Sequence, residues 1–158
     1  MRIVVISDTH RDFNGLYNLV EQQKDCTDLF LHLGDGERET EDLLALMPGL
    51  PLRFVQGNCD LCSLAPAQDM LQADGIRIFM THGHLYQVKY SLDTFIEEAR
   101  MLHASVALYG HTHRPYYHYE EGLHILNPGS LSQPRACARS YGVIEVRNGQ
   151  VLCSLSKL

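Results

Sequence analysis

The sequence of 158 residues predicts an α/β fold that combines parallel strand crossovers with an antiparallel hairpin. Five short apolar runs rich in β-branched residues have the length of buried strands, and segments with helical periodicity separate several of them. Alternation of strands and helices is typical of parallel sheets. Near the end of the chain, two alternating runs flank Asn148-Gly149. This dipeptide is typical of a two-residue hairpin, whose strands are antiparallel.

Each of the five predicted strands ends in polar residues that can bind a metal ion. No packing requirement places an acid, an amide or a histidine at the same end of five buried strands. If the strands lie side by side in one sheet, these polar groups converge at one edge of it. The five segments are IVVISDTH (3–10), LFLHLGD (29–35), LRFVQGNCD (52–60), IRIFMTHGH (76–84) and VALYGHTH (106–113). The converging side chains are Asp8, His10, Asp35, Asn58, His82, His111 and His113.

Three segments of the chain have the periodicity or composition of helices. Residues 12–20 place apolar side chains three and four positions apart, and Asp12 is suited to cap this helix. Residues 37–47 are helical by composition and precede a Pro-Gly pair. Ser91 is expected to cap the third helix, whose apolar stripe runs from Leu92 to Leu102.

The composition is that of a globular protein, with 45% hydrophobic and 20% charged residues. We expect residues 1–158 to form one domain. No apolar run approaches the roughly 18 residues that a membrane span needs. The strand-like start leaves no room for a secretory segment, so we expect a cytoplasmic protein. The five cysteines are odd in number and scattered, which predicts free thiols.

The charge of the chain limits the partners that it can bind. The formal net charge of -6 and the absence of a Lys/Arg cluster argue against tight binding to long nucleic acid, which needs several cations to neutralise phosphates. A small phosphorylated substrate held by metal ions is compatible with this charge.

The seven converging side chains predict a site for two metal ions. Two carboxylates, four imidazoles and one amide form a nitrogen and oxygen ligand set that suits Mn, Fe, Co, Ni or Zn better than Ca or Mg. One carboxylate can bridge two ions about 3.5 to 4 Å apart, and a water shared by such ions has its pKa lowered from near 16 toward about 7. Attack of this metal-bound hydroxide on phosphorus makes phosphoester hydrolysis the reaction that these residues suit best.

The ordered motifs also resemble a known family. D-x-H (8–10), G-D (34–35), G-N-x-D (57–60), the THGH segment with His82 and G-H-x-H (110–113) are similar, over essentially the whole chain, to the calcineurin-like metallophosphoesterases. The segments GNCD and NPGS (127–130) and the small size are most similar to the compact bacterial and archaeal phosphodiesterase branch. The resemblance implies a four-layer αββα sandwich with mixed sheets and the C-terminal hairpin.

The resemblance further implies how the ligands divide between two ions. One ion would be held by Asp8, His10, Asp35 and His113, and the other by Asp35, Asn58, His82 and His111. Asp35 would bridge the two ions that hold the nucleophilic water, and Asn58 would also face the substrate. The resemblance favours Mn²⁺, whereas the ligand set alone also allows Fe, Zn, Co or Ni.

Cys59 departs from the family pattern. Many members carry G-N-H-D, whose histidine is suited to protonate the leaving oxygen, and this chain has a cysteine at that position. A thiol is a poor substitute for an imidazolium at neutral pH. Unaided expulsion of poor leaving groups is then weak, so we expect activated diesters and aryl phosphates to be hydrolysed better than simple alkyl monoesters.

Several other residues are candidates for supporting roles. Arg11 and His84 could contact the phosphate of a substrate. Asp60 is expected to brace the turn at Asn58, and His32 is expected to be structural or to support a ligand. The remaining predictions are a supporting role for Asn127 and Ser130, a surface position for His103, surface or strand positions for His118 and His124, and a homo-oligomer interface formed by Tyr86, Tyr90, Tyr116, Tyr117 and Tyr119.

Two other classes of function stay open. One eukaryotic relative in the family, a retromer subunit, serves mainly in protein assembly, so the chain could be a scaffold of the same fold. The chemistry would also suit a phosphomonoesterase or a nuclease. The filled ligand positions favour an enzyme over a scaffold, and the acidic charge argues against a nuclease on long nucleic acid.

Overall fold

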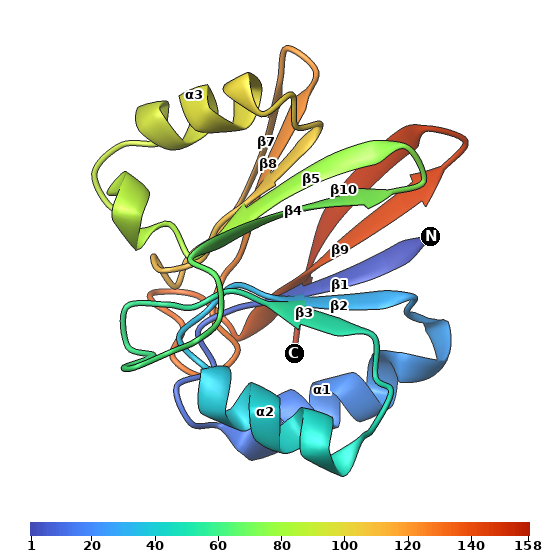
Figure 1. Ribbon diagram of the computed structural model, residues 1–158, viewed down its shortest axis with the longest axis vertical. Coiled ribbons are helices and arrows are strands. Elements are labelled where there is room, and N and C mark those ends of the chain that lie inside the picture. Colours follow the sequence, from blue (N-terminus) through green and yellow to red (C-terminus); the bar gives the residue numbers. More distant parts are fainter.

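The computed structural model describes residues 1–158, which form two five-stranded mixed sheets packed face to face (Figure 1). The strand order of the first sheet is β10-β9-β1-β2-β3, and that of the second is β4-β5-β6-β8-β7. The first sheet contains β1 (Arg2–Ile6), β2 (Leu29–His32), β3 (Leu52–Phe54), β9 (Ser140–Arg147) and β10 (Gln150–Lys157). The second contains β4 (Gln68–Ala73), β5 (Ile76–Thr81), β6 (Val106–Leu108), β7 (Pro115–Glu120) and β8 (Leu123–Pro128).

Helices cover the outer face of each sheet, which confirms the four-layer αββα arrangement (Figure 1). Helices α1 (Phe13–Gln23) and α2 (Glu37–Leu46) lie against the first sheet, and α3 (Asp93–Met101) lies against the second. Two short 3-10 helices, η1 (Lys24–Cys26) and η2 (His84–Tyr86), complete the secondary structure. None of the helices has the length and apolar character that a membrane crossing would require.

The near-continuous apolar runs of the sequence are explained by strands that are buried on both faces. In β1, Ile3 and Val5 contribute to the core between the two sheets, whereas Val4 and Ile6 pack with α1 and α2. Successive side chains of a strand point to opposite faces, so both faces must be apolar when both are covered. The same alternation in β5 directs Ile78 and Met80 inward and Phe79 toward α3.

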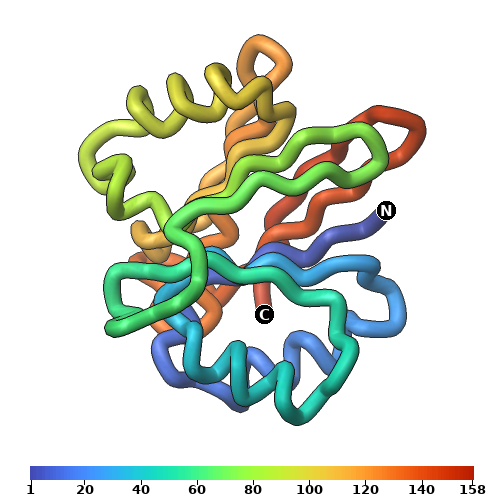
Figure 2. Tube along the Cα trace, viewed as in Figure 1, coloured from blue at the N-terminus to red at the C-terminus, as the bar shows by residue number.

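The expectation that all five motif strands lie in one sheet is wrong. Strands β1, β2 and β3 belong to the first sheet, whereas β5 and β6 belong to the second. Figure 2 shows the chain leaving the first sheet in teal, building the second in green to orange, and returning to the first in red. Short β3 is the edge of the first sheet, with Arg53 exposed, and the chain then begins a new sheet with β4. The motifs still meet because the carboxyl ends of these strands in the two sheets face the same side.

The C-terminal hairpin is confirmed, and the structure adds two hairpins that the sequence analysis missed. Asn148 and Gly149 join β9 to β10 with φ values of 52° and 76°. Asp74-Gly75 joins β4 to β5 and Glu121-Gly122 joins β7 to β8, with both residues of each pair also at positive φ. Positive φ at both positions is the requirement of a type I′ turn. The Asp-Gly pair was a usable signal for the first of these hairpins.

The three predicted helices form, and their ends agree with the sequence in two cases. The Asp12 carboxylate accepts a hydrogen bond of 2.9 Å from the Gly15 N–H, as expected of a cap for α1. Helix α2 ends one residue earlier than predicted. The expected cap of α3 is wrong by one position, because Leu92 occupies the cap and Ser91 accepts only from the Asp93 N–H at 3.1 Å.

Candidate metal centre

Six of the seven predicted ligands lie together where the two sheets meet. Asp8, His10 and Asp35 follow strands of the first sheet, and the three histidines 82, 111 and 113 follow strands of the second. Their nitrogen and oxygen atoms form two groups of three, Asp8 with His10 and His113 and Asp35 with His82 and His111, each with its atoms within 4.8 Å of one another. These residues span more than 100 positions of the chain, from Asp8 to His113, so only the fold brings the whole set together.

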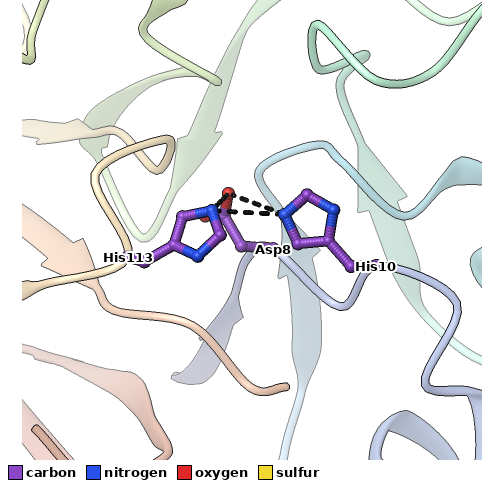
Figure 3. A group of neighbouring side chains, drawn as sticks. All are labelled: Asp8, His10 and His113. Carbon is purple, nitrogen blue, oxygen red and sulfur yellow. Dashed lines mark hydrogen bonds and ion pairs between the residues drawn. The ribbon is translucent and has the colours of Figure 1, made fainter. Parts of the chain in front are cut away.

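The first group contains Asp8, His10 and His113, whose side chains point toward one another in Figure 3. The Nε2 atom of His113 lies 3.1 Å from Asp8 Oδ1 and 3.2 Å from His10 Nε2. The His10 Nε2 atom lies 3.8 Å from the same carboxylate oxygen. Three potential ligand atoms therefore surround one point.

The second group contains Asp35, His82 and His111. His82 Nε2 lies 3.4 Å from Asp35 Oδ2 and 3.2 Å from His111 Nδ1. The same Asp35 oxygen is 3.7 Å from His10 Nε2, in the first group. The Asp35 carboxylate is therefore within reach of both groups.

The oxygen and nitrogen atoms of the cluster are better suited to bind cations than to hydrogen-bond one another. Asp8 is fully buried, and its Oδ1 atom has no hydrogen-bond partner. A buried carboxylate oxygen without a partner is costly unless a cation is bound to it. The Nδ1–H of His82 donates to the backbone oxygen of Leu33, and the Nδ1–H of His113 donates to that of Gln133, each at 2.7 Å. This contact directs Nε2 of each ring into the cluster, where it can bind a metal ion once it has lost its proton.

Charge in the cluster shifts the pKa values of its members in opposite directions. Burial alone would raise the pKa of Asp35, but contacts with His82 and with the Cys59 N–H outweigh burial and lower it. Burial alone would lower the pKa of His82, but Asp35 and Asp8 outweigh it and raise the value. Burial and the charge of His82 lower the pKa of His111 to about 4. Asp35 is therefore ionised at neutral pH, and the pKa values of His82 and His111 are shifted in opposite directions.

The backbone is strained at most of the candidate ligands. Positive φ values place Asp8, His10, Asp35, His111 and His113 in the left-handed region, at 41° to 67°. A residue with a Cβ pays on the order of 1 kcal/mol or more for this conformation, and such strain is concentrated at functional sites. Backbone hydrogen bonds hold two of the turns against each other, from Asp8 N–H to Gly34 and from His10 N–H to Asp35. The strain aims these side chains into one small volume.

Asp60 braces the turn at Asn58, as the sequence predicted, and also holds the start of α2. Its carboxylate accepts hydrogen bonds of 2.7 to 3.0 Å from four backbone N–H groups, those of Asp35, Gly36, Glu37 and Gly57. A Cβ on Gly57 would overlap the Asp35 carboxylate, so glycine is required for this close approach.

Glu39 and Thr9 support the cluster and were missed by the sequence analysis. Glu39 is only 4% exposed and accepts hydrogen bonds from the Thr9 hydroxyl at 2.6 Å and from the Arg11 N–H at 2.7 Å. These bonds hold the turn that carries His10. Glu39 lies in the polar first half of α2, residues 37–42, so its burial had no local signal.

His32 is buried and structural, because its Nδ1 accepts from the Gly34 N–H and its Nε2 lies 3.0 Å from Thr9 Oγ1.

The end of β8 and the segment that follows it also support the cluster. The Ser130 and Ser132 hydroxyls donate to the backbone oxygen of Asp8 at 2.8 and 3.1 Å. The Asn127 amide donates to the backbone oxygen of Gly110 at 2.8 Å. Asn127 and Ser130 therefore position the turns that carry ligands, as the sequence predicted.

Asn58 is the predicted ligand that the structure does not turn toward the cluster. Its side chain is exposed, and its amide nitrogen donates to the Cys59 sulfur at 3.3 Å. Cys59 lies closer to the cluster, because its N–H donates to Asp35 Oδ1 at 2.7 Å and its sulfur groups with His10 and Asp35 within 4.8 Å. Burial and the neighbouring Asp35 raise the pKa of the Cys59 thiol to about 11.

The two candidates for phosphate contact lie beside the cluster. The His84 ring is 5.5 Å from that of His82 and 6.1 Å from that of His111, and its buried Nδ1 has no hydrogen-bond partner. Arg11 is exposed and lines a cavity of about 670 Å³ that also opens onto His10, Asp35 and Cys59.

Other predicted positions lie away from the cluster. His103 and His118 are exposed and His124 is half-buried, and all five cysteines are free, as expected. The five tyrosines do not form one surface, because neighbours on a strand point to opposite faces. Tyr116 lies 6.5 Å from Tyr109, whereas Tyr117 lies 6.1 Å from His124.

Two packed mixed sheets with an Asp and His cluster at their meeting strand ends are the architecture of a metal-dependent phosphoesterase. Residues 1–149 match the calcineurin-like phosphoesterase superfamily domain, and the chain belongs to this family. The probable metallophosphoesterase YsnB of Bacillus subtilis is 33% identical over 150 residues, covering 94% of this chain and 86% of that protein.

Two further relatives extend this comparison. The crystal structure of a predicted phosphoesterase from Streptococcus pneumoniae superposes with a TM-score of 0.86 at 29% identity, covering 99% of this chain and 88% of that one. The phosphodiesterase YfcE of Escherichia coli is 33% identical over 101 residues, which cover 58% of this chain and 50% of YfcE. The fold expected from the resemblance is thereby confirmed.

Proposed function

We propose that this protein is a phosphodiesterase that uses two divalent metal ions to hydrolyse small phosphodiesters. The observation that carries the proposal is the position of Asp35, whose Oδ2 lies 3.7 Å from His10 in one ligand group and 3.4 Å from His82 in the other. A carboxylate within reach of two groups of ligands is suited to bridge two ions.

The ligand sets of the proposal follow the two groups. Asp8, His10, Asp35 and His113 hold one ion, and Asp35, Asn58, His82 and His111 hold the other. Asn58 joins its set only if its amide rotates away from Cys59. When bound, the two ions supply an activated water as nucleophile and neutralise charge on the phosphoryl oxygens. Manganese is the first ion to test, and Fe, Zn, Co or Ni also suit this ligand set.

The protein's own groups orient the reacting atoms. The backbone contacts of His82 and His113 fix their ring orientation, and the Glu39 and Asp60 networks fix the turns of His10 and Asp35. Arg11 and His84 are placed to contact the substrate phosphate. Cys59 is a poor acid with its raised pKa, so the leaving group must depart largely by its own stability.

Three observations favour diesters of small molecules. The relative YfcE carries the name of a phosphodiesterase. The cavity beside the cluster has the size of a small-molecule pocket, at about 670 Å³. The net charge of -6 disfavours long nucleic acid.

Four exposed free cysteines fit a reducing compartment, which supports a cytoplasmic location.

Hydrolysis of bis-p-nitrophenyl phosphate with added Mn²⁺ tests the proposal. We expect EDTA to abolish the activity. Asp35→Asn should lower the activity by more than about 100-fold, the upper end of the loss typical for residues that only support a metal ligand. Asp42→Asn, an exposed carboxylate on α2, is the matched control and should retain the activity.

Other results would contradict the proposal in distinct ways. Proven metal binding with no hydrolysis under any of the candidate metals would favour a scaffold. Salt-sensitive retention and cleavage of oligonucleotides would favour a nuclease, and hydrolysis of monoesters alone would favour a phosphomonoesterase.

A further inference from the structure

The loop after Asp60 exposes two leucines beside the metal cluster. Leu61 is 87% exposed and Leu64 is 98% exposed, and both line the cavity that contains His10 and Asp35. Single exposed apolar side chains are common on protein surfaces. Two within four residues, at the rim of the candidate active site, indicate a surface that is covered when a ligand is bound.

The position of this loop is fixed relative to the cluster. At its start, the Cys59 N–H donates to the Asp35 carboxylate and the Asp60 carboxylate accepts from the Asp35 N–H. At its end, the backbone oxygen of Pro66 accepts from the Gln56 N–H at 2.9 Å, which closes the loop. Any group that contacts the leucines is therefore held at a defined place relative to the reacting phosphate.

The cavity walls carry no excess of positive charge away from the cluster. Three of the lining carboxylates are already engaged, Asp35 in the cluster and Glu39 and Asp60 with backbone N–H groups. The remaining charged lining groups are two of each sign: Arg11, Arg38, Glu37 and Glu41. No excess of positive charge is left for a second phosphate or a carboxylate of the substrate.

We propose that Leu61 and Leu64 bind an uncharged apolar group of the substrate, so that the preferred diester carries an alkyl or aryl group on its non-leaving side. This inference rests on the proposed phosphodiesterase function and names the substrate class of the same site. Burial of apolar surface against the two leucines supplies the binding, and the lack of excess positive charge in the walls disfavours an anionic group in the same place.

A series of diesters with one shared p-nitrophenyl leaving group tests the inference on the Mn²⁺-loaded full chain. The second ester group is methyl, hexyl, phenyl or 5-carboxypentyl, the last matching hexyl in length but adding a charge. We expect kcat/KM to be at least about tenfold higher for hexyl or phenyl than for methyl, because burial of about two methylene groups is worth about tenfold. A larger rise in kcat/KM for the hexyl ester identifies an alkyl preference, and a larger rise for the phenyl ester identifies an aryl preference. The carboxypentyl ester should fall at least about tenfold below hexyl.

A double variant locates the effect on the loop. In Leu61→Ser/Leu64→Ser we expect the hexyl-to-methyl ratio of kcat/KM to fall below about 3, mainly through KM. Leu152→Ser, which removes a 64% exposed leucine from β10, is the matched control and should keep the wild-type ratio. A ratio that survives in the double variant overturns the inference.

The remaining outcomes separate this inference from the proposed function. Equal hydrolysis of the methyl, hexyl and phenyl esters overturns the inference and leaves the phosphodiesterase standing. Failure to hydrolyse any ester overturns both. A dimer by size-exclusion chromatography that the double variant converts to a monomer would show that the leucines pack against a second copy, and this also overturns the inference.

Discussion

Asp8 shows at the scale of one residue why the cluster is suited to cations. It is fully buried. The Ser7 hydroxyl and the His111 N–H donate to one of its carboxylate oxygens, and the other oxygen faces His113 at 3.1 Å without a hydrogen bond. Burial alone would raise its pKa, but contact with His113 and the charge of His82 keep it below its usual value. A carboxylate that stays ionised without surface exposure is ready to bind a metal ion without first losing a proton.

Metal binding should release protons from histidine and not from the carboxylates. The pKa values of His82 and His113 are raised above 6.5, so each ring is more than half protonated at pH 6.5, whereas His111, with its pKa lowered to about 4, is already neutral. We therefore expect Mn²⁺ to release about one to two protons per chain at pH 6.5, fewer at higher pH, and its affinity to rise with pH across this range. Calorimetry in buffers of different ionisation enthalpy measures this number. Metal binding without proton release at pH 6.5 would show that the metal does not replace a proton on these histidines.

Replacing Cys59 by histidine should improve the hydrolysis of esters with poor leaving groups. An imidazolium at this position can protonate the leaving oxygen, and general acid catalysis contributes about 100-fold or more where it operates. For Cys59→His we expect at least about a tenfold rise for an alkyl ester relative to a p-nitrophenyl ester, measured as the ratio of the two kcat/KM values. Cys62→His, at a second exposed cysteine of the same cavity, is the control. An unchanged ratio would mean that the side chain does not face the leaving group.

At the scale of secondary structure, helix α2 is tied to the cluster at two points. The Asp60 carboxylate accepts from the N–H groups at its start, where Gly36 offers no side chain as a cap. One turn later, Glu39 holds the Thr9 hydroxyl and the Arg11 N–H. The helix therefore positions His10 and Asp35 although it contributes no ligand of its own.

Removing the Glu39 carboxylate should weaken metal binding. Glu39→Leu leaves the Arg11 N–H and the Thr9 hydroxyl without their acceptor, so the turn of His10 loosens, and we expect the Kd for Mn²⁺ to rise by about 10- to 100-fold. Glu39→Gln keeps an acceptor oxygen and should lose much less, and Glu41→Leu on the exposed face of the same helix should lose nothing. Titration calorimetry measures all three, and an unchanged Kd in Glu39→Leu would limit that residue to a role in stability.

At the scale of the whole molecule, the cluster joins the two sheets. Asp8, His10 and Asp35 come from the first sheet and the three other histidines from the second, and the His111 N–H donates to the Asp8 carboxylate across the junction. A metal site formed by side chains of both sheets exists only while the sheets remain packed. Metal binding is thereby linked to global stability.

Bound metal should raise the melting temperature. With free Mn²⁺ at about 100 times Kd, the stabilisation is about 2.7 kcal/mol, which corresponds to roughly 5 to 10 °C in Tm for a chain of this size. EDTA should reverse the shift, and Asp35→Asn should reduce it strongly, whereas Asp42→Asn should keep it. Differential scanning calorimetry gives the comparison. A shift that Asp35→Asn retains in full would place the stabilising ion elsewhere.

Local features of the sequence determined most elements and most of the candidate ligands. The strand ends at Asp8, Asp35 and His111, the capped start of α1 and the Asn-Gly hairpin depend on apolar periodicity and turn chemistry within a few residues. The order of the polar motifs was enough to predict a metal site and the family. These features can be seen in the sequence because the forces that produce them act between near neighbours in the chain.

The tertiary structure decided how these parts are arranged. It divided the motif strands between two sheets, buried Glu39 under the turn of His10, turned Asn58 toward Cys59 and split the tyrosines between two faces. Each of these outcomes depends on which distant segments pack together. Burial and side-chain direction are set by contacts between residues remote in the chain, and no local pattern specifies those contacts.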